Sequence, residues 1–98
     1  MLFDMTTETD DQFYARADEH IHTANEQLDG DNRGKVSASM MYATARFNAW
    51  ISACTSQTGD ELLSAKKDIL EYFVEQYRQM LEEHLDDYAQ NFDKYMKS

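Results

Sequence analysis

Apolar residues recur at helical spacing in three segments of this chain. In the first segment they stand three or four positions apart, at Phe13, Ala17, Ile21, Ala24 and Leu28. One stripe of this kind predicts an amphipathic helix. Thr9 and Gln12 have the spacing of a capping box at its start, and Gly30 is suited to a left-handed cap at its end. We therefore expect a helix over about residues 10–29.

The second segment is apolar on two faces. Steps of four and three residues join the members of one seam, which are Val36, Met40, Ala43, Phe47, Trp50 and Cys54. A second face carries mostly small residues, namely Ala38, Met41, Ala45, Ala49 and Ala53. A helix that is apolar on two faces is typically contacted on both sides. The pattern predicts a central helix over about residues 35–57.

The third segment has neither Gly nor Pro from Asp60 to the end, and its apolar residues keep helical spacing to Met96. It predicts a helix over about residues 60–96, which would be ~55 Å long against ~35 Å for the second helix. An antiparallel second helix would then cover the third only to about residue 82. The uncovered apolar residues are Leu85, Tyr88, Phe92, Tyr95 and Met96.

A second copy of the chain is the expected cover for this apolar end, since a continuous aromatic patch is rarely left in water. The pattern therefore predicts a homodimer. An alternative stays open, in which the third helix breaks near His84–Asp87. Asp86 or Asp87 would then cap a short fourth helix that folds back on the third.

Composition supports an all-α fold. Together with the apolar spacing, it predicts a three-helix domain with a long C-terminal helix, in a dimeric helical bundle. The 98 residues include three Gly and no Pro, whereas a β-rich domain of this size needs more of both for its turns. We expect one domain over residues 1–98, with residues 1–8 as a flexible N-terminal tail. No apolar run is long enough to cross a membrane, and the acidic N-terminus is not typical of a secretion signal.

The single cysteine, Cys54, excludes an internal disulfide and fits a reducing compartment. The sequence therefore predicts a cytoplasmic protein. Because Cys54 lies on the apolar seam of the second helix, we expect it to be buried as a small apolar residue rather than reactive.

Charge is distributed unevenly along the chain, whose net charge is −10. Residues 1–31 carry nine acids and one base, residues 32–59 carry three bases and no acid, and residues 60–98 carry ten acids and five bases. A strongly acidic protein lacks the cationic surface that nucleic acids and anionic membranes require. The charge excludes those partners and allows a basic protein partner.

No constellation of residues predicts catalysis, a metal site or a cofactor. The loop DGDNRG resembles the start of a calcium loop, but Arg33 and Met40 stand where oxygen ligands are needed. His20, His22 and His84 lack the spacing of a helical metal site. We therefore expect a protein that is not an enzyme and binds no cofactor.

Arg46 is the one charged residue in the middle of the acid-free segment. Tyr42 and Trp50 stand four residues to either side of Arg46, a spacing suited to cation–π contact. Arg46, with Lys35, Arg33 and Asn48 as helpers, is a candidate contact for an anionic ligand or a partner. The interpretation we favour is an internal tie, in which a buried Arg46 pairs with a carboxylate. The candidate carboxylates are Asp18, Glu71 and Glu75 of the neighbouring helices, or an acid of a second subunit.

A resemblance to known proteins covers about residues 12–96. It is carried by FYARADEHIHTANEQL, RGKVSASMMYATARFNAW and EYFVEQYRQMLEEHLDDYAQNFDKYM. These stretches resemble the domain of unknown function 3144 family, which consists of short proteobacterial proteins. The resemblance implies a bacterial source and supplies no activity or site residue.

Two functions follow from the sequence. The first is a non-enzymatic helical module for protein–protein interaction that acts as a homodimer. The alternative is a small protein that binds an anionic ligand in a pocket around Arg46.

Overall fold

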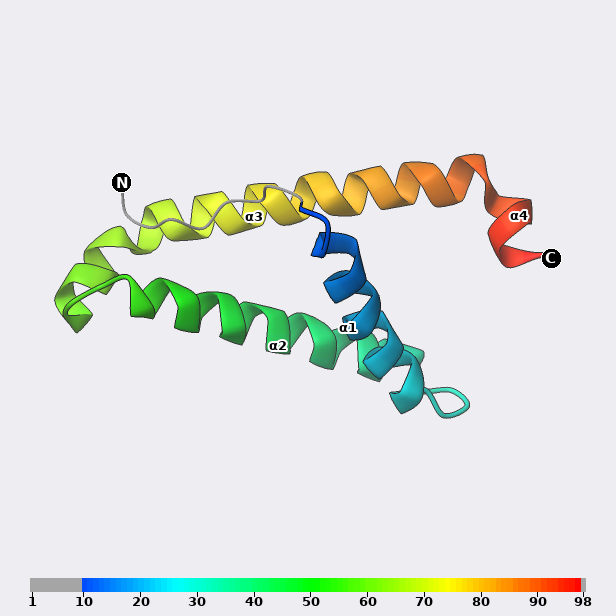
Figure 1. The fold of residues 1–98 in the computed structure, drawn as a ribbon, viewed down its shortest axis with the longest axis horizontal. Helices are drawn as coiled ribbons and strands as arrows, with labels where there is room; N and C mark the ends of the chain where they lie inside the picture. Colours follow the sequence, from blue (N-terminus) through cyan, green and yellow to red (C-terminus); the bar gives the residue numbers. More distant parts are fainter. Residues whose placement is uncertain (1–9, 98) are drawn as a thin grey trace. The chain divides into compact units, whose positions relative to one another are not determined.

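Nearly all of the described chain is helical. The computed structural model describes residues 10–97 (Figure 1), so Thr9 and the predicted tail over residues 1–8 lie outside the described part. Residues 10–97 contain no strand, which confirms the all-α prediction. The helices are α1 (Phe13–Gln27), α2 (Arg33–Cys54), α3 (Gly59–Gln90) and α4 (Phe92–Met96).

The chain separates into two compact units. One unit ends at Gly59 and contains α1 and α2, which contact each other. The other unit begins at Asp60 and contains α4 and all but the first residue of α3. The helices predicted over about 10–29 and 35–57 correspond to α1 and α2, and the one predicted over about 60–96 is divided into α3 and α4.

Asp10 organises the start of α1. Its Oδ1 accepts hydrogen bonds from the backbone N–H of Gln12 at 2.9 Å and from Arg16 Nη2 at 3.2 Å. The Gln12 N–H, followed by Arg16, lowers the pKa of Asp10 below its ordinary value. An aspartate at this place satisfies an early N–H and suits the positive end of the helix dipole.

Asn32 and Gly30 shape the connection between α1 and α2. Asn32 Oδ1 accepts a hydrogen bond from Asp29 N at 2.7 Å, and Asn32 Nδ2 donates to Gln27 O at 2.9 Å. Gly30 has φ of 68°, which confirms the predicted left-handed glycine after the first helix. The Asn32 side chain thus ties the last turn of α1 to the residue that precedes α2.

The predicted apolar seam of α2 is largely exposed, which corrects the expectation of a helix covered on both sides. Val36 is buried, but Phe47, Trp50 and Cys54 are exposed, so the expectation of a buried Cys54 is also wrong. The way in which α1 meets α2 explains part of this difference. Figure 1 shows α1 crossing α2 at an angle near the start of α2, so that α1 does not cover the rest of that helix.

Ser52 is buried where α2 ends, with a relative exposure of 1%. Its Oγ donates a hydrogen bond to Asn48 O at 3.0 Å, and its own carbonyl accepts one from Thr55 Oγ1 at 2.8 Å. A serine hydroxyl that bonds to the carbonyl four residues earlier is satisfied without a distant partner. The end of α2 is therefore closed by local hydrogen bonds.

The helix predicted to run to residue 96 breaks at Asn91. The long C-terminal helix is confirmed as α3 and the short fourth helix of the alternative as α4, but the break does not lie near His84–Asp87 where the alternative expected it. Asn91 leaves helical geometry at φ −116° and ψ 33°, and its Nδ2 donates to Asp87 Oδ1 at 2.9 Å and to Asp87 O at 3.2 Å. Asparagine side chains compete with the backbone for such bonds, and this favours a helix end.

Candidate interaction surfaces

The five residues predicted to lie at a dimer contact form the C-terminal cluster. They are Leu85, Tyr88, Phe92, Tyr95 and Met96, and all are exposed. The break at Asn91 brings Tyr95 back toward α3, so that the rings of Tyr88 and Tyr95 lie 4.8 Å apart between centroids. The Tyr95 hydroxyl donates to Asp87 Oδ2 at 3.0 Å, and this bond raises the pKa of Tyr95 above its ordinary value.

Burial along α3 stops well before this cluster. The half-buried residues of its first part share one helix face and are Leu62, Ala65, Ile69, Tyr72, Phe73 and Gln76. Between Gln76 and Asp87 every residue is exposed, including Met80, Leu81 and Leu85. An apolar stripe that continues after its burial ends is an incomplete packing surface.

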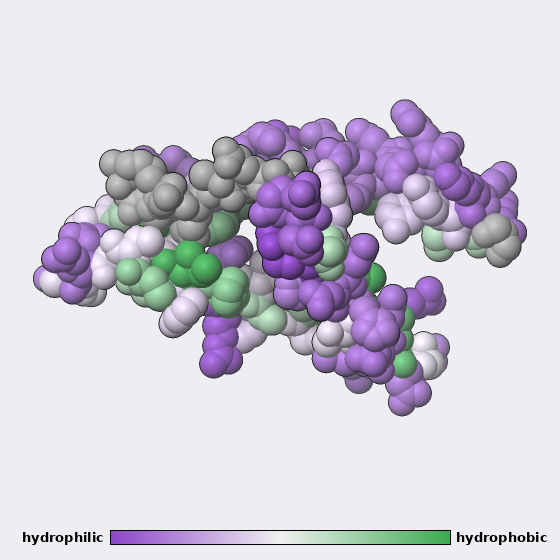
Figure 2. Space-filling model, in the orientation of Figure 1, coloured by the Kyte–Doolittle hydropathy of each residue, from purple (hydrophilic) through white to green (hydrophobic). Residues whose placement is uncertain are grey.

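A second exposed surface lies on α2, and we call it the Arg46 face. It consists of Lys35, Tyr42, Arg46, Phe47 and Trp50, all of which are exposed. Tyr42 is 72%, Phe47 58% and Trp50 60% exposed, and the Phe47 and Trp50 rings lie 5.9 Å apart. Figure 2 shows hydrophobic residues gathered along α2 on the face in view, where α1 and α3 are mainly hydrophilic.

Arg46 is not the buried internal tie that we favoured from the sequence. Its side chain is exposed, and within residues 10–97 it makes neither an ion pair nor a cation–π contact. Trp50 pairs with Phe47 instead. Arg46 is therefore a cation in solvent beside exposed aromatic rings.

Glu75, one of the carboxylates considered for Arg46, is engaged on its own helix. Its Oε2 accepts a hydrogen bond from Arg78 Nη2 at 2.6 Å and another from Gln79 Nε2 at 2.8 Å. Arg78, followed by Gln79, lowers the pKa of Glu75 to about 2. Glu75 in turn raises the pKa of the Arg78 guanidinium, and the contact of Arg78 with Glu82 at 3.3 Å adds to this effect. Asp18 and Glu71 form no ion pair with Arg46 in the described part of the chain.

Asn48 does not share the Arg46 face, although the sequence suggested it as a helper. It is half-buried, and its carbonyl accepts the bond from Ser52 Oγ. Two residues along a helix turn through about 200°, so Asn48 and Arg46 point to opposite sides. The sequence analysis did not assign Phe47 to the Arg46 face, because its place in the predicted seam suggested burial. Its spacing of three residues from Trp50 could have indicated that the two rings lie side by side.

Candidate metal ligands and membrane-spanning helices were sought in the rest of the described chain. No group of three or more His, Cys, Asp or Glu within residues 10–97 is placed to hold a metal ion. His22 Nε2 lies 3.4 Å from Glu26 Oε2, an exposed pair within one helix. None of the helices in this range combines the length and apolar character that a bilayer crossing requires.

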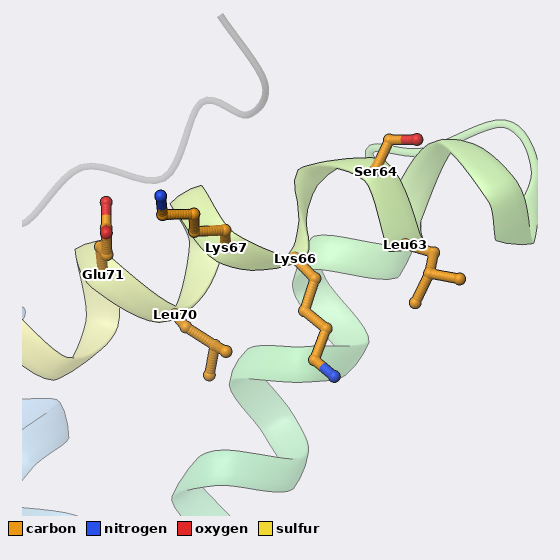
Figure 3. A pocket seen from close by; sticks show the side chains of 6 residues that line it. All are labelled: Leu63, Ser64, Lys66, Lys67, Leu70 and Glu71. Carbon is orange, nitrogen blue, oxygen red and sulfur yellow. The ribbon is translucent and has the colours of Figure 1, made fainter.

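A shallow hollow lies on α3, lined by Leu63, Ser64, Lys66, Lys67, Leu70 and Glu71. Figure 3 shows Leu63, Lys66 and Leu70 on one side of the helix and Ser64, Lys67 and Glu71 on the other. Side chains that diverge in this way do not converge on one ligand. The hollow includes none of the residues suggested for ligand binding.

Together these features define a small all-α protein in which the C-terminal cluster and the Arg46 face are exposed. The family model described as protein of unknown function (DUF3144) matches residues 13–89, and the chain belongs to this family. The resemblance seen in the sequence is thereby confirmed. A similar solved structure is the NMR structure of the protein NB7890A from Shewanella sp., with 38% sequence identity and a TM-score of 0.73. The match covers 89% of this chain and 93% of that chain. No curated protein matches the chain.

Proposed function

We propose that this protein is a non-enzymatic helical module for protein–protein interaction and that it acts as a homodimer. The observation that carries the proposal is the exposed C-terminal cluster at the end of α3 and on α4. Contiguous exposed aromatic and aliphatic side chains mark surfaces that bind another protein. Two-fold self-association is the commonest way in which a soluble protein covers such a surface.

Helix lengths support a second copy as the cover. The 32 residues of α3 extend ~48 Å, whereas the 22 residues of α2 extend ~33 Å. A contact along the full length of α2 would therefore still leave ~15 Å of α3, and α4 beyond it, without a neighbour from α2. The C-terminal cluster lies in that remainder. The net charge of −10 favours a basic protein as any further partner.

The test is the molar mass in solution, measured by light scattering or sedimentation equilibrium with a reductant because Cys54 is exposed. We expect twice the chain mass of 11.5 kDa at micromolar concentration. Leu85→Glu should raise the dissociation constant by about 100-fold or more, since both copies lose an apolar contact and bury a charge. A monomer in the wild-type protein at tens of micromolar overturns the proposal.

Gln90→Glu is the matched control. Gln90 is exposed on α3, nine residues after Leu81, and points away from the stripe that contains Leu85. It receives the same negative charge as Leu85→Glu but should leave the dissociation constant unchanged. Equal weakening by both substitutions would mean that added charge, rather than the cluster, governs association.

The alternative function, binding of a small anionic ligand at Arg46, rests on the exposed guanidinium that has no carboxylate partner within residues 10–97. Titration with inorganic phosphate, followed by NMR at the Arg46 Nε–H, tests it. A saturable shift that Arg46→Gln abolishes supports this alternative, and a linear response equal to that of Arg33 argues against it.

A further inference from the structure

We propose that α3 pairs with α3 of a second copy in an antiparallel coiled coil. The two helices meet along an exposed, mostly apolar face, which we call the α3 stripe. This inference rests on the proposed homodimer and names the surface of the second copy that covers the α3 part of the C-terminal cluster. The pairing depends only on the internal geometry of α3, which is one continuous helix.

The α3 stripe runs from Leu63 to Tyr88, over ~38 Å. Its eight positions follow each other at alternating intervals of four and three residues. At about 100° per residue, they lie within about 60° of one line along the helix. All eight are exposed, and six are apolar or aromatic. The members are Leu63, Lys67, Leu70, Val74, Tyr77, Leu81, His84 and Tyr88. Such alternation over about four heptads is typical of a coiled-coil seam.

The half-buried face of α3 is a different one. Its residues, which lie between Leu62 and Gln76, are centred about 130° around the helix from the α3 stripe. Tyr88 of the C-terminal cluster belongs to the stripe, and Leu85 lies beside it. The stripe is therefore the exposed one of two apolar faces, and it carries the α3 part of the cluster.

An antiparallel arrangement matches the residues of the α3 stripe by polarity. When Leu70 of one copy lies opposite Leu81 of the other, every further layer of the contact is also fixed. The layers join Leu63 with Tyr88, Lys67 with His84, Leu70 with Leu81, and Val74 with Tyr77 of the second copy. The two polar residues thus share a layer, in which an unprotonated nitrogen of the imidazole can accept a hydrogen bond from the ammonium group.

A parallel arrangement is disfavoured by Lys67. It would place each residue of the stripe opposite the same residue of the second copy, so that two ammonium groups would share one layer. Like charges that face each other in an interface are costly. Within residues 10–97, Lys67 makes no ion pair that would neutralise its charge. A single polar residue in a coiled-coil seam is known to fix the register in this way.

Glu71 and Arg78 provide charge complementarity beside the stripe. Both are exposed, and they lie on the same flank, at about 80° and 60° from its central line. In an antiparallel pair, a flank faces the same flank of the second copy. The register of the four layers brings Glu71 of each copy to within ~3 Å of Arg78 of the other along the helix axis. The two-fold axis therefore creates two attractive pairs.

Both members of this pair are able to bond across the contact. Glu71 makes no ion pair in the described part of the chain. Arg78 uses three of its five N–H groups for Glu75 and Glu82 of its own helix, which leaves two for a further carboxylate.

The hollow on α3 lies on the stripe, since Leu63, Lys66, Lys67 and Leu70 are among the residues that line it (Figure 3). In the antiparallel register this hollow faces His84 of the second copy. A space between successive seam residues is where a side chain of the facing helix inserts in a coiled coil. The hollow is thus suited to a side chain of a neighbouring helix, although it does not suit a small ligand.

Distances between paired spin labels test the orientation. Gln79→Cys and Gln90→Cys, each combined with Cys54→Ser and labelled with a nitroxide, occupy exposed positions that point away from the stripe. The register places the two-fold axis between Glu75 and Gln76. The two labels of a dimer are then offset along the helices by ~10 Å at position 79 and by ~44 Å at position 90. We expect double electron–electron resonance to give a distance that is about 20 Å longer at position 90, whereas a parallel pair gives similar distances at both.

A charge-reversal series tests the register. Glu71→Lys should raise the dissociation constant of the dimer about tenfold, because repulsion replaces attraction at both symmetric contacts. Arg78→Glu in the same chain should return it to within about threefold of the wild type, since the two charges are then exchanged. In a parallel pair Glu71 would lie beside Lys66 of the second copy, and Arg78→Glu would not compensate. Glu83→Lys is the matched control, because it makes the same charge change on the opposite side of α3 and should leave the constant unchanged.

The outcomes separate the antiparallel pairing from the proposed function. A wild-type monomer overturns both, and is the result expected if the same chain covers the stripe. A wild-type dimer with similar label distances at the two positions overturns the antiparallel pairing alone. So does a dimer that Glu71→Lys leaves unchanged, or one that the double substitution fails to restore while its helicity is kept. Circular dichroism measures that helicity, and the label distances decide if the double variant loses it.

Discussion

The hydroxyl of Tyr95 donates a hydrogen bond to Asp87 Oδ2 at 3.0 Å, and this contact ties α4 to the last turns of α3. Asn91 donates to the other carboxylate oxygen of Asp87 at 2.9 Å. One carboxylate therefore holds both the helix break and the side chain that folds back over it. This junction between α3 and α4, which we call the Asp87 corner, keeps Tyr88 and Tyr95 together in the C-terminal cluster.

Tyr95→Phe should loosen this corner while it keeps the aromatic ring. We expect amide exchange in residues 92–96 to accelerate roughly threefold to tenfold, as the loss of one hydrogen bond allows. Hydrogen exchange followed by NMR measures this, and Tyr77→Phe on the exposed part of α3 is the control. Equal exchange in both variants would show that the Asp87 bond does not hold α4.

The same bond predicts a pH dependence at high pH. The Asp87 bond raises the pKa of Tyr95 above its ordinary value of 10.0. The contribution of this bond to the stability of the folded chain is therefore fully present below pH 10. It is lost as the pH rises through the higher pKa that Tyr95 has in the folded chain. Ultraviolet absorbance of tyrosinate should show one group that titrates late in the wild-type protein and is missing in Tyr95→Phe. Its presence in Tyr95→Phe would assign the late titration to another tyrosine.

Glu75 should titrate far below an ordinary glutamate. Arg78 and Gln79 lower its pKa from 4.5 to about 2, so its contribution to stability is present above pH 4.5 and is lost as the pH falls through about 2. Arg78→Gln should bring the Glu75 midpoint back toward 4.5, and Lys66→Gln should not. NMR titration of the Glu75 carboxyl carbon measures the midpoint. A midpoint near 4.5 in the wild-type protein would contradict the Arg78 pair.

Asn32→Ala should destabilise the unit formed by α1 and α2. The substitution removes the bonds to Asp29 N and Gln27 O, and we expect a loss of about 1–2 kcal/mol in the free energy of unfolding. Urea unfolding followed by circular dichroism measures the change. Asn25→Ala, on the exposed surface of α1, is the control and should stay within about 0.5 kcal/mol of the wild type.

The sequence predicts local geometry well where one residue type decides it. Gly30 was expected to take a left-handed conformation because glycine has no Cβ to clash, and its φ of 68° agrees. The break at Asn91 could not be predicted from spacing, because apolar residues keep helical intervals through Met96. It depends on side-chain bonds from Asn91 and Tyr95 to Asp87, which a periodic pattern does not encode.

Burial was harder to predict than helicity. The seam through Phe47, Trp50 and Cys54 has the spacing of a packed helix face, yet these residues are exposed in the single chain. Apolar spacing predicts that a helix has an apolar face. It does not predict which element, or which chain, packs against that face. The same difficulty affects Arg46, whose acid-free surroundings suggested burial although its side chain is exposed.

Contact between copies is tested most directly by isotope-filtered NOE spectroscopy on an equal mixture of labelled and unlabelled protein. If the C-terminal cluster is covered by a second copy, the Leu85 methyl groups should show intermolecular NOEs. Detection of only intramolecular NOEs from Leu85, at a concentration well above that used for the mass measurement, would contradict the dimer.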